Sequence, residues 1–184
     1  MDSRFEMEIQ KARKEYEEAI GAGQIKKSND NKRFTRFFFE RSENSLLTAN
    51  LLYQISNNSE DKTSLKIDES YGSYMWVIVT CYYSMFYMAS ALISKKGVKV
   101  GSSDAHKNVK NAFLRLYIEN SDLERRLGME YTQCKEIAHD LMQERNKRSK
   151  YQYDVGLNVL KRDAEMSIKH AKNFFEKTRK VIEE

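Results

Sequence analysis

Residues 74–93 read YMWVIVTCYYSMFYMASALI, and the surrounding stretch 70–94 contains no charged side chain. Twenty uncharged residues are enough to cross a lipid bilayer as a helix. However, Thr80 and the run Tyr82-Tyr83-Ser84 lie at its centre, where hydrocarbon disfavours hydroxyl groups, and tyrosines of membrane spans gather at the interfaces. A helix that other helices cover on every side has the same composition. The stretch therefore predicts the central helix of a helical bundle, and no membrane partner is expected.

The composition of the whole chain also favours helices. Its 184 residues, with 32% charged and 40% hydrophobic side chains, suit one domain or one domain with an added arm. Only 7 glycines and no proline are present, although these residues build the many tight turns of a β-sandwich or barrel. We therefore expect an all-α fold.

Charge and cysteine content leave the choice of partner open. Lys and Arg outnumber Asp and Glu by 32 to 27, and the resulting net charge of +5 permits a polyanionic partner such as RNA without requiring one. Cys81 and Cys134 form no CxxC pair and indicate no disulfide framework, which is typical of a reducing compartment. The first twenty residues are charged throughout and lack the apolar region of a signal peptide. The expected location is the cytoplasm.

Apolar residues recur at three- and four-residue steps through most of the chain, as in amphipathic helices. Residues 1–33 are expected to form a helical but weakly anchored arm with a polar linker, and residues 34–184 a bundle. Within the bundle we expect helices at 34–56, at 71–95, from a cap at Asp104, from a cap at Ser121 or Asp122 through Met142, and in the C-terminal segment, with 56–70 as a polar loop. The last helix places one apolar stripe on a single face: Leu157, Leu160, Ala164, Ile168, Ala171, Phe175 and Ile182. The sequence thus predicts an up-and-down bundle of about five helices with an additional N-terminal helical arm.

Conventional enzyme motifs are missing from the sequence. There is no phosphate loop, Rossmann glycine fingerprint or HExxH helix. The three histidines, His106, His139 and His170, are scattered, so we expect no metal site, and no cofactor is predicted. Cys81 falls in the most apolar helix, where a thiol is usually inert.

Two features remain as candidates for function. The segment 144–150, ERNKRSK, carries four cations and is followed by Tyr151, Gln152, Tyr153 and Asp154. It is either a solvated helix end whose cations complement the helix dipole, or a phosphate-binding patch with tyrosine rings for base stacking. The second feature is the aromatic run 82–87, which is either core packing or, through Tyr83 and Tyr87 on one face, the lining of a cleft or dimer seam.

The same residues resemble a known family. The string CYYSMFYMASAL at 81–92, then Lys96-Gly97, His106-Lys107-Asn108-Val109 and Phe113, is similar to the core of HEPN-domain proteins, and most of all to their UPF0332 group. The C-terminal hallmark of that group, Arg-x-x-x-x-Tyr-Asp, resembles Arg148 to Asp154, followed by a helix with spaced Ala and Phe. The resemblance covers roughly residues 38–184 and implies a five-helix, usually homodimeric bundle.

The resemblance also implies what the cationic segment does. In catalytic HEPN members an Arg, followed four to six residues later by His, forms a metal-independent ribonuclease site across the dimer. Here positions 149–155 contain no His, and Tyr is a poor general base near neutral pH. We therefore expect a nucleotide- or RNA-binding module, with a ribonuclease toxin of a toxin–antitoxin pair as the alternative. In such pairs the partner is a minimal nucleotidyltransferase antitoxin that modifies a tyrosine, here Tyr151 or Tyr153.

The candidate site residues follow from this resemblance. Arg148 and Tyr153 are the candidate catalytic pair. A second register of the motif begins at Arg145-Asn146, where Tyr151 follows six residues after Arg145. The sequence leaves the choice between the two registers open. The candidate nucleotide- or phosphate-binding residues are Arg145, Asn146, Lys150, Tyr151, Asp154, Tyr83 and His106.

Overall fold

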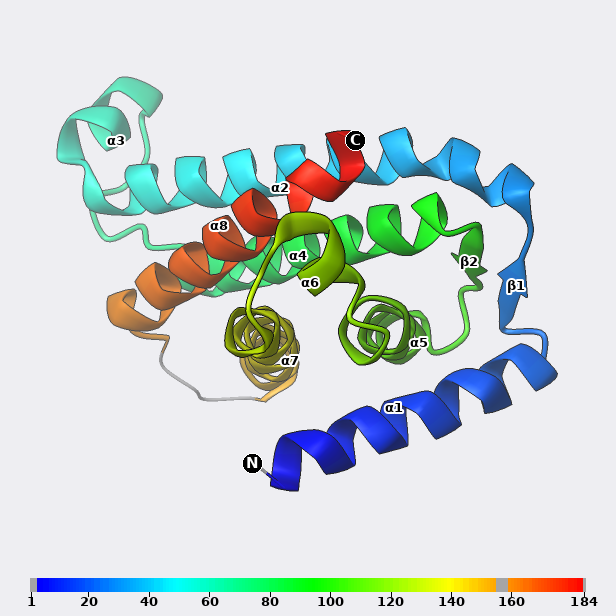
Figure 1. The fold of residues 1–184 in the computed structure, drawn as a ribbon. Helices are drawn as coiled ribbons and strands as arrows, with labels where there is room; N and C mark the ends of the chain where they lie inside the picture. Colours follow the sequence, from blue (N-terminus) through cyan, green and yellow to red (C-terminus); the bar gives the residue numbers. More distant parts are fainter. Residues whose placement is uncertain (1–2, 155–158, 184) are drawn as a thin grey trace.

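The computed structural model of the chain describes residues 3–154 and 159–183. Its elements, in order, are α1 (Ser3–Gly21), β1 (Ile25–Lys27), the 3₁₀-helix η1 (Asn29–Arg33), α2 (Phe34–Asn57), α3 (Ser59–Leu65), α4 (Tyr74–Lys95), β2 (Val98–Val100), α5 (Ala105–Phe113), the π-helix η2 (Leu114–Glu119), α6 (Asp122–Leu127), α7 (Tyr131–Tyr153) and α8 (Lys161–Glu183). The predicted all-α fold is confirmed. Helices α2, α4, α5, α7 and α8 form the bundle, with α2 along one side and α1 along the other (Figure 1).

Helix α4 is the central helix of this bundle. Most of its residues are buried, and it packs against α2, α5, α7 and α8. It is long and apolar enough to cross a bilayer, but 78% of its most apolar window is buried inside the protein. The stretch that opened the sequence analysis therefore forms a core helix, as its central hydroxyl groups predicted.

Small buried residues let α2 and α4 approach closely in antiparallel orientation. The hydroxyl of Ser42 donates to the carbonyl oxygen of Ser84 at 2.8 Å. At one end of the two helices, the hydroxyls of Ser56 and Ser73 lie 3.0 Å apart and form a second hydrogen bond. Because each serine finds a partner, the buried hydroxyls do not carry the cost of unmade hydrogen bonds.

Helix α1 is more firmly attached than the sequence suggested, and the expectation of a weakly anchored arm is wrong. Phe5, Ile9, Ala12, Tyr16 and Ala19 are buried at alternating steps of four and three, and this face packs against α5 and η2. Two of the five are alanines, so the stripe has little apolar bulk in the sequence although it is continuous in space.

A short two-stranded sheet joins the linker that follows α1 to the segment that follows α4. Strands β1 and β2 pair antiparallel, with Ile25 opposite Val100 and Lys27 opposite Val98. Gly97 makes the close approach: its φ is +76°, and a Cβ there would lie 2.9 Å from the carbonyl oxygen of Ser28. Only glycine fits both the positive φ and the contact, so the polar linker follows one defined path.

Several expected boundaries were also wrong. The segment 56–70 contains the short helix α3 and is not a plain loop. The helix expected from Ser121 or Asp122 through Met142 is broken into α6 and α7 at Gly128, whose φ is +60°. The side chains of Asp104 and Ser121, both at left-handed backbone positions, make no cap hydrogen bond. In the C-terminal stripe Ala164, Ala171 and Phe175 are buried, Leu160 is exposed ahead of α8, and Leu157 lies outside the described residues.

Candidate functional site

A cavity lies where α5 and α7 run alongside each other, both seen end-on in Figure 1. It has a volume of about 420 Å³ and is partly open to solvent. Its walls come from α4, the turn before α5, the first turn of α5 and the last turns of α7, and they include Tyr82, Ser102, Asp104, His106, Lys107, Arg145, Asn146, Arg148 and Ser149. Residues more than sixty positions apart in the chain therefore meet here.

The cationic segment lies within α7, and the helix divides it between two faces. Arg145 and Arg148 are three positions apart, which puts both on the side that lines the cavity. Glu144 and Lys147 lie on the side facing α8, where the Lys147 ammonium donates to Glu144 at 2.8 Å. Only part of the segment is thus directed to the cavity, and the rest holds the bundle together.

Glu144 is the centre of that structural contact. Its side chain is 0% exposed, and its Oε1 lies 2.8 Å from Nδ1 of His170 as well as from Lys147. Burial alone would raise the pKa of Glu144, but hydrogen bonds from His170, Lys147 and Ser167 outweigh it and keep the pKa below its usual value. The carboxylate is therefore ionised at neutral pH and joins α7 to α8.

Arg148 is positioned by two tyrosines. Its Nη2 donates to the Tyr83 hydroxyl at 3.2 Å, and the guanidinium carbon lies 5.7 Å from the Tyr83 ring centroid and 5.2 Å from that of Tyr153. The Nε atom is buried without a hydrogen-bond partner among the described residues. Within those residues neither Arg148 nor Arg145 takes part in an ion pair. Among the described residues, the cavity therefore presents two guanidinium groups that form no ion pair, and its walls also contain the carboxylate of Asp104.

His106 enters the same cavity from α5. The Tyr82 hydroxyl lies 2.8 Å from its Nδ1, and the imidazole packs on Phe86 at 4.6 Å between ring centroids. Burial lowers the pKa of His106, and the charges of Arg148 and Arg145 lower it further. The imidazole is therefore neutral at pH 7, with Nδ1 engaged by Tyr82 and Nε2 left for a ligand.

The comparison with protein families agrees with this arrangement. The model of the HEPN domain matches residues 36–181, which is most of the chain. The chain belongs to the HEPN family. As a HEPN protein it is a nucleotide- or RNA-related helical module. Neither the search of curated proteins nor the search of solved structures gave a match.

The structure of this HEPN protein brings together some of the predicted site residues. Arg145, Asn146, Arg148 and His106 line one cavity, so the arginines of both registers lie at the same place, although the tyrosines of the two registers do not line it. Tyr83 and Tyr153 do not line it, but the rings of both lie close to the Arg148 guanidinium.

Three predicted residues lie elsewhere in the HEPN domain. The Tyr151 hydroxyl donates to Oδ2 of Asp163 at 3.0 Å, so its ring faces α8. The Lys150 ammonium lies 5.7 Å from the Tyr151 ring centroid, and Asp154 ends α7 with its backbone N–H bonded to the carbonyl of Lys150. These three do not line the cavity between α5 and α7.

Sequence reasoning missed several contributors to the site, among them Tyr82 and Lys107. Tyr82 falls within the aromatic run and is 1% exposed, yet its hydroxyl reaches His106 at the cavity wall. Lys107 follows His106 and adds a cation at the first turn of α5. The sequence signal for Lys107 was its place beside His106 in the resemblance to HEPN proteins, whereas nothing local distinguishes the hydroxyl of Tyr82 from those of its neighbours.

Proposed function

We propose that this HEPN protein binds a phosphate group of a nucleotide or of RNA in the cavity between α5 and α7, and that it acts as a homodimer. The observation that carries the proposal is the pair Arg145 and Arg148, which line the cavity and form no ion pair among the described residues. Guanidinium groups match phosphate oxygens in both geometry and charge. A bound phosphate would supply a counter-charge for these two guanidinium groups.

The neighbouring groups suit the rest of a nucleotide. If the Tyr82 hydroxyl donates to Nδ1, neutral His106 keeps its proton on Nε2, which then donates to a phosphate oxygen. Asn146 and Ser149 add uncharged polar groups to the same wall. The ring of Tyr153, 63% exposed beside Arg148, offers a stacking face for a base.

Thermal melting with a pair of matched ligands tests this proposal. AMP should raise the melting temperature, whereas adenosine, which has the base and sugar but no phosphate, should not. At a hundred-fold excess over Kd the gain in the free energy of unfolding is about 2.7 kcal/mol. Arg145→Met and Arg148→Met should each reduce the shift. Equal shifts from AMP and adenosine would contradict a phosphate site.

The uncharged surface of α4 supports the homodimer. Trp76, Thr80, Tyr83 and Tyr87 recur at helical spacing, and the helices of one chain leave this strip partly uncovered, with Trp76 50% exposed. An aromatic strip of this kind suits a two-fold interface, where the same patch on both copies is buried. Because Tyr83 contacts Arg148, a partner on this strip would also enclose the site.

The position of His106 favours a second candidate, a metal-independent ribonuclease of the toxin type. Positions 149–155 contain no His, but His106 brings a neutral imidazole to Arg145 and Arg148 from α5. In the other tautomer its Nε2 takes the proton of a ribose 2′-hydroxyl. The 2′-oxygen then bonds to phosphorus, the 5′-oxygen leaves with a proton from water, and a 2′,3′-cyclic phosphate forms, while the arginines stabilise the charge on phosphorus.

Expression in bacterial cells separates the two candidates. If the protein is a ribonuclease, its expression should arrest growth and produce RNA fragments that end in a 2′,3′-cyclic phosphate. EDTA should not inhibit this cleavage, and Arg148→Ala and His106→Ala should abolish it. The Tyr153→Phe variant tests the hydroxyl that the sequence analysis singled out. Intact RNA, together with an AMP-dependent melting shift, favours the binding module.

A minimal nucleotidyltransferase partner would modify Tyr153 in preference to Tyr151. The Tyr153 side chain is exposed, whereas the Tyr151 hydroxyl is hydrogen-bonded to Asp163.

A further inference from the structure

A second cavity of about 400 Å³ lies next to the first, between α1, α5 and α7. Arg145 and Asn146 line both cavities, so the two adjoin across these side chains. In Figure 1, α1 runs below α5 and α7 and forms the outer wall of the second cavity. The HEPN match begins at residue 36, so this wall is an addition to the family domain.

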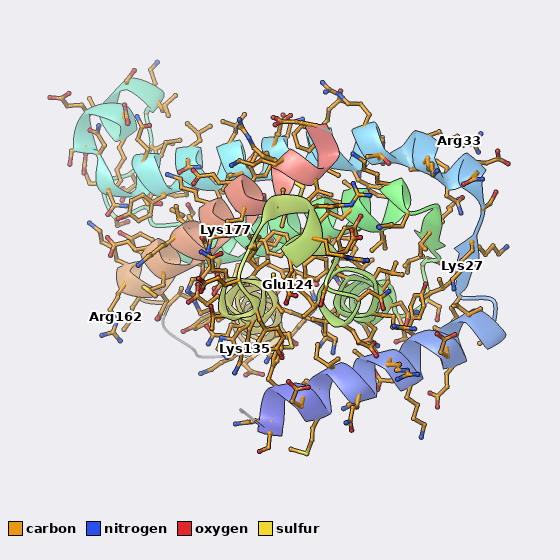
Figure 2. The ribbon with its side chains drawn as sticks, in the orientation of Figure 1. Lys27, Arg33, Glu124, Lys135, Arg162 and Lys177 are labelled. Atoms are coloured by element: carbon orange, nitrogen blue, oxygen red, sulfur yellow. The ribbon has the colours of Figure 1, made fainter. Side chains whose placement is uncertain are left out.

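The second cavity is strongly cationic. Its walls carry Arg4, Lys11, Lys110, Lys135 and Arg145, against the single carboxylate of Glu8. Figure 2 shows Lys135 on the side of α7 that faces α1, and its ammonium lies 5.3 Å from the Phe5 ring centroid. Cations therefore converge on this space from all three helices.

Lys110 shows how crowded these charges are. It is 9% exposed, and its ammonium lies 3.8 Å from the Glu8 carboxylate. Burial lowers the pKa of Lys110. Glu8 and Glu15 oppose this shift, whereas Arg145 and Lys11 add to it. The two carboxylates do not outweigh burial and the neighbouring cations, so the pKa stays below its usual value, and an anion beside Lys110 would stabilise its charge.

We propose that the two cavities are successive phosphate subsites of one groove, and that its ligand is a single-stranded RNA segment and not a mononucleotide. This inference rests on the function proposed above for the first cavity. Each cavity has the volume of a small-ligand site, and a cationic groove that follows the backbone, with aromatic rings beside it, is how single strands are bound. Arg145 stands between the subsites and contacts both phosphates, whereas Lys110 and Lys11 serve the second one alone.

Calorimetric titration with AMP and with the tetranucleotide A4 of RNA tests the proposal on the full chain. The tetranucleotide should bind at least ten-fold more tightly than AMP. Lys110→Met should weaken tetranucleotide binding about ten-fold and reduce the slope of log K against log salt by about 0.7, the value for one phosphate of a single strand. Its affinity for AMP should stay within two-fold of the wild type.

Two further variants make the result decisive. Because Lys110 is buried, the exposed Lys11→Met provides a second probe of the same subsite and should weaken only the tetranucleotide. Lys14→Met, on the same helix but outside the cavity and 80% exposed, is the matched control and should change neither affinity. The second subsite would be overturned if the wild type bound AMP and the tetranucleotide equally tightly. It would also be overturned if Lys110→Met and Lys11→Met weakened the binding of both ligands to the same extent, or of neither. Failure of the wild type to bind either ligand would instead overturn the proposed function itself.

Discussion

The hydroxyl of Tyr82 lies 2.8 Å from Nδ1 of His106, and this contact connects the core helix α4 to the cavity between α5 and α7. Tyr82 is 1% exposed, and burial raises the pKa of its hydroxyl well above the usual value, so it stays protonated. His106 is therefore oriented by a group that packing has already fixed. A site built on such a rigid contact needs little rearrangement to receive a ligand.

Ligand affinity should depend on pH through His106. Burial, Arg148 and Arg145 hold the pKa of the free imidazole below its usual 6.5. A bound phosphate favours the protonated imidazole and raises this pKa. At a pH between the pKa of the free protein and that of the complex, ligand binding is therefore accompanied by proton uptake. Affinity for a dinucleoside monophosphate, whose phosphodiester does not titrate in this range, should rise as the pH falls from 7.5 to 5.5. The His106→Asn variant should show a flat profile, and a wild-type profile equally flat would exclude His106 from the site.

The Tyr82→Phe variant should separate orientation from protonation. It removes the hydroxyl but keeps the ring, and loss of one hydrogen bond costs about 1 kcal/mol of the free energy of unfolding. Affinity should fall a few-fold because the imidazole is less well oriented, while the rise of affinity at low pH remains. An unchanged affinity in the same calorimetric titration would show that the contact does not serve the site.

Replacement of Glu144 should affect stability and leave binding nearly intact. Glu144→Gln removes the charge that holds Lys147 and His170, and we expect a loss of about 2 kcal/mol in the free energy of unfolding at pH 7, measured in urea. Since the folded-state pKa of Glu144 lies below that of the unfolded chain, the difference from wild type should persist above about pH 4.5 and shrink as the pH falls through the folded value. Glu136→Gln, on an exposed face of the same helix, is the control and should cost under about 0.5 kcal/mol.

The homodimer should be visible by light scattering. At tens of micromolar the measured mass should be twice the 21.7 kDa of one chain. Trp76→Asp, which places a charge in the exposed strip of α4, should shift the protein to monomers, whereas Met166→Asp, at an exposed position of α8, should not. A wild-type protein that is strictly monomeric would argue against the interface and against any site shared between subunits.

The parts of the fold that sequence analysis predicted are those encoded by composition and by local spacing. The uncharged stretch around Tyr82 had to be buried, and its central hydroxyls argued against lipid, so α4 was predictable as a core helix. The docking of α1 was not, because alanines such as Ala12 give little apolar signal but allow close packing on α5. The break at Gly128 was also missed, since its effect depends on a left-handed backbone angle.

The candidate site divides in the same way. Arg145 and Arg148 share a helix, so their common face follows from a spacing of three residues. The meeting of His106 with them depends on how α5 and α7 each pack against α4, and helix packing is not encoded in any local pattern. The resemblance to HEPN proteins pointed to His106, but only the structure shows it beside the arginines and bonded to Tyr82.

The most direct test of the account is the affinity of the Arg148→Met variant for RNA tetranucleotide, compared with that of Lys150→Met. Both variants lose one cation from the same two turns of α7, but only Arg148 lines the cavity. Since a hydrogen bond to a charged group contributes about 1.5–3 kcal/mol, Arg148→Met should weaken binding at least ten-fold. Lys150→Met should stay within about two-fold of wild type. Equal losses in the two variants would show that the ligand responds only to overall charge, and would contradict a phosphate site between α5 and α7.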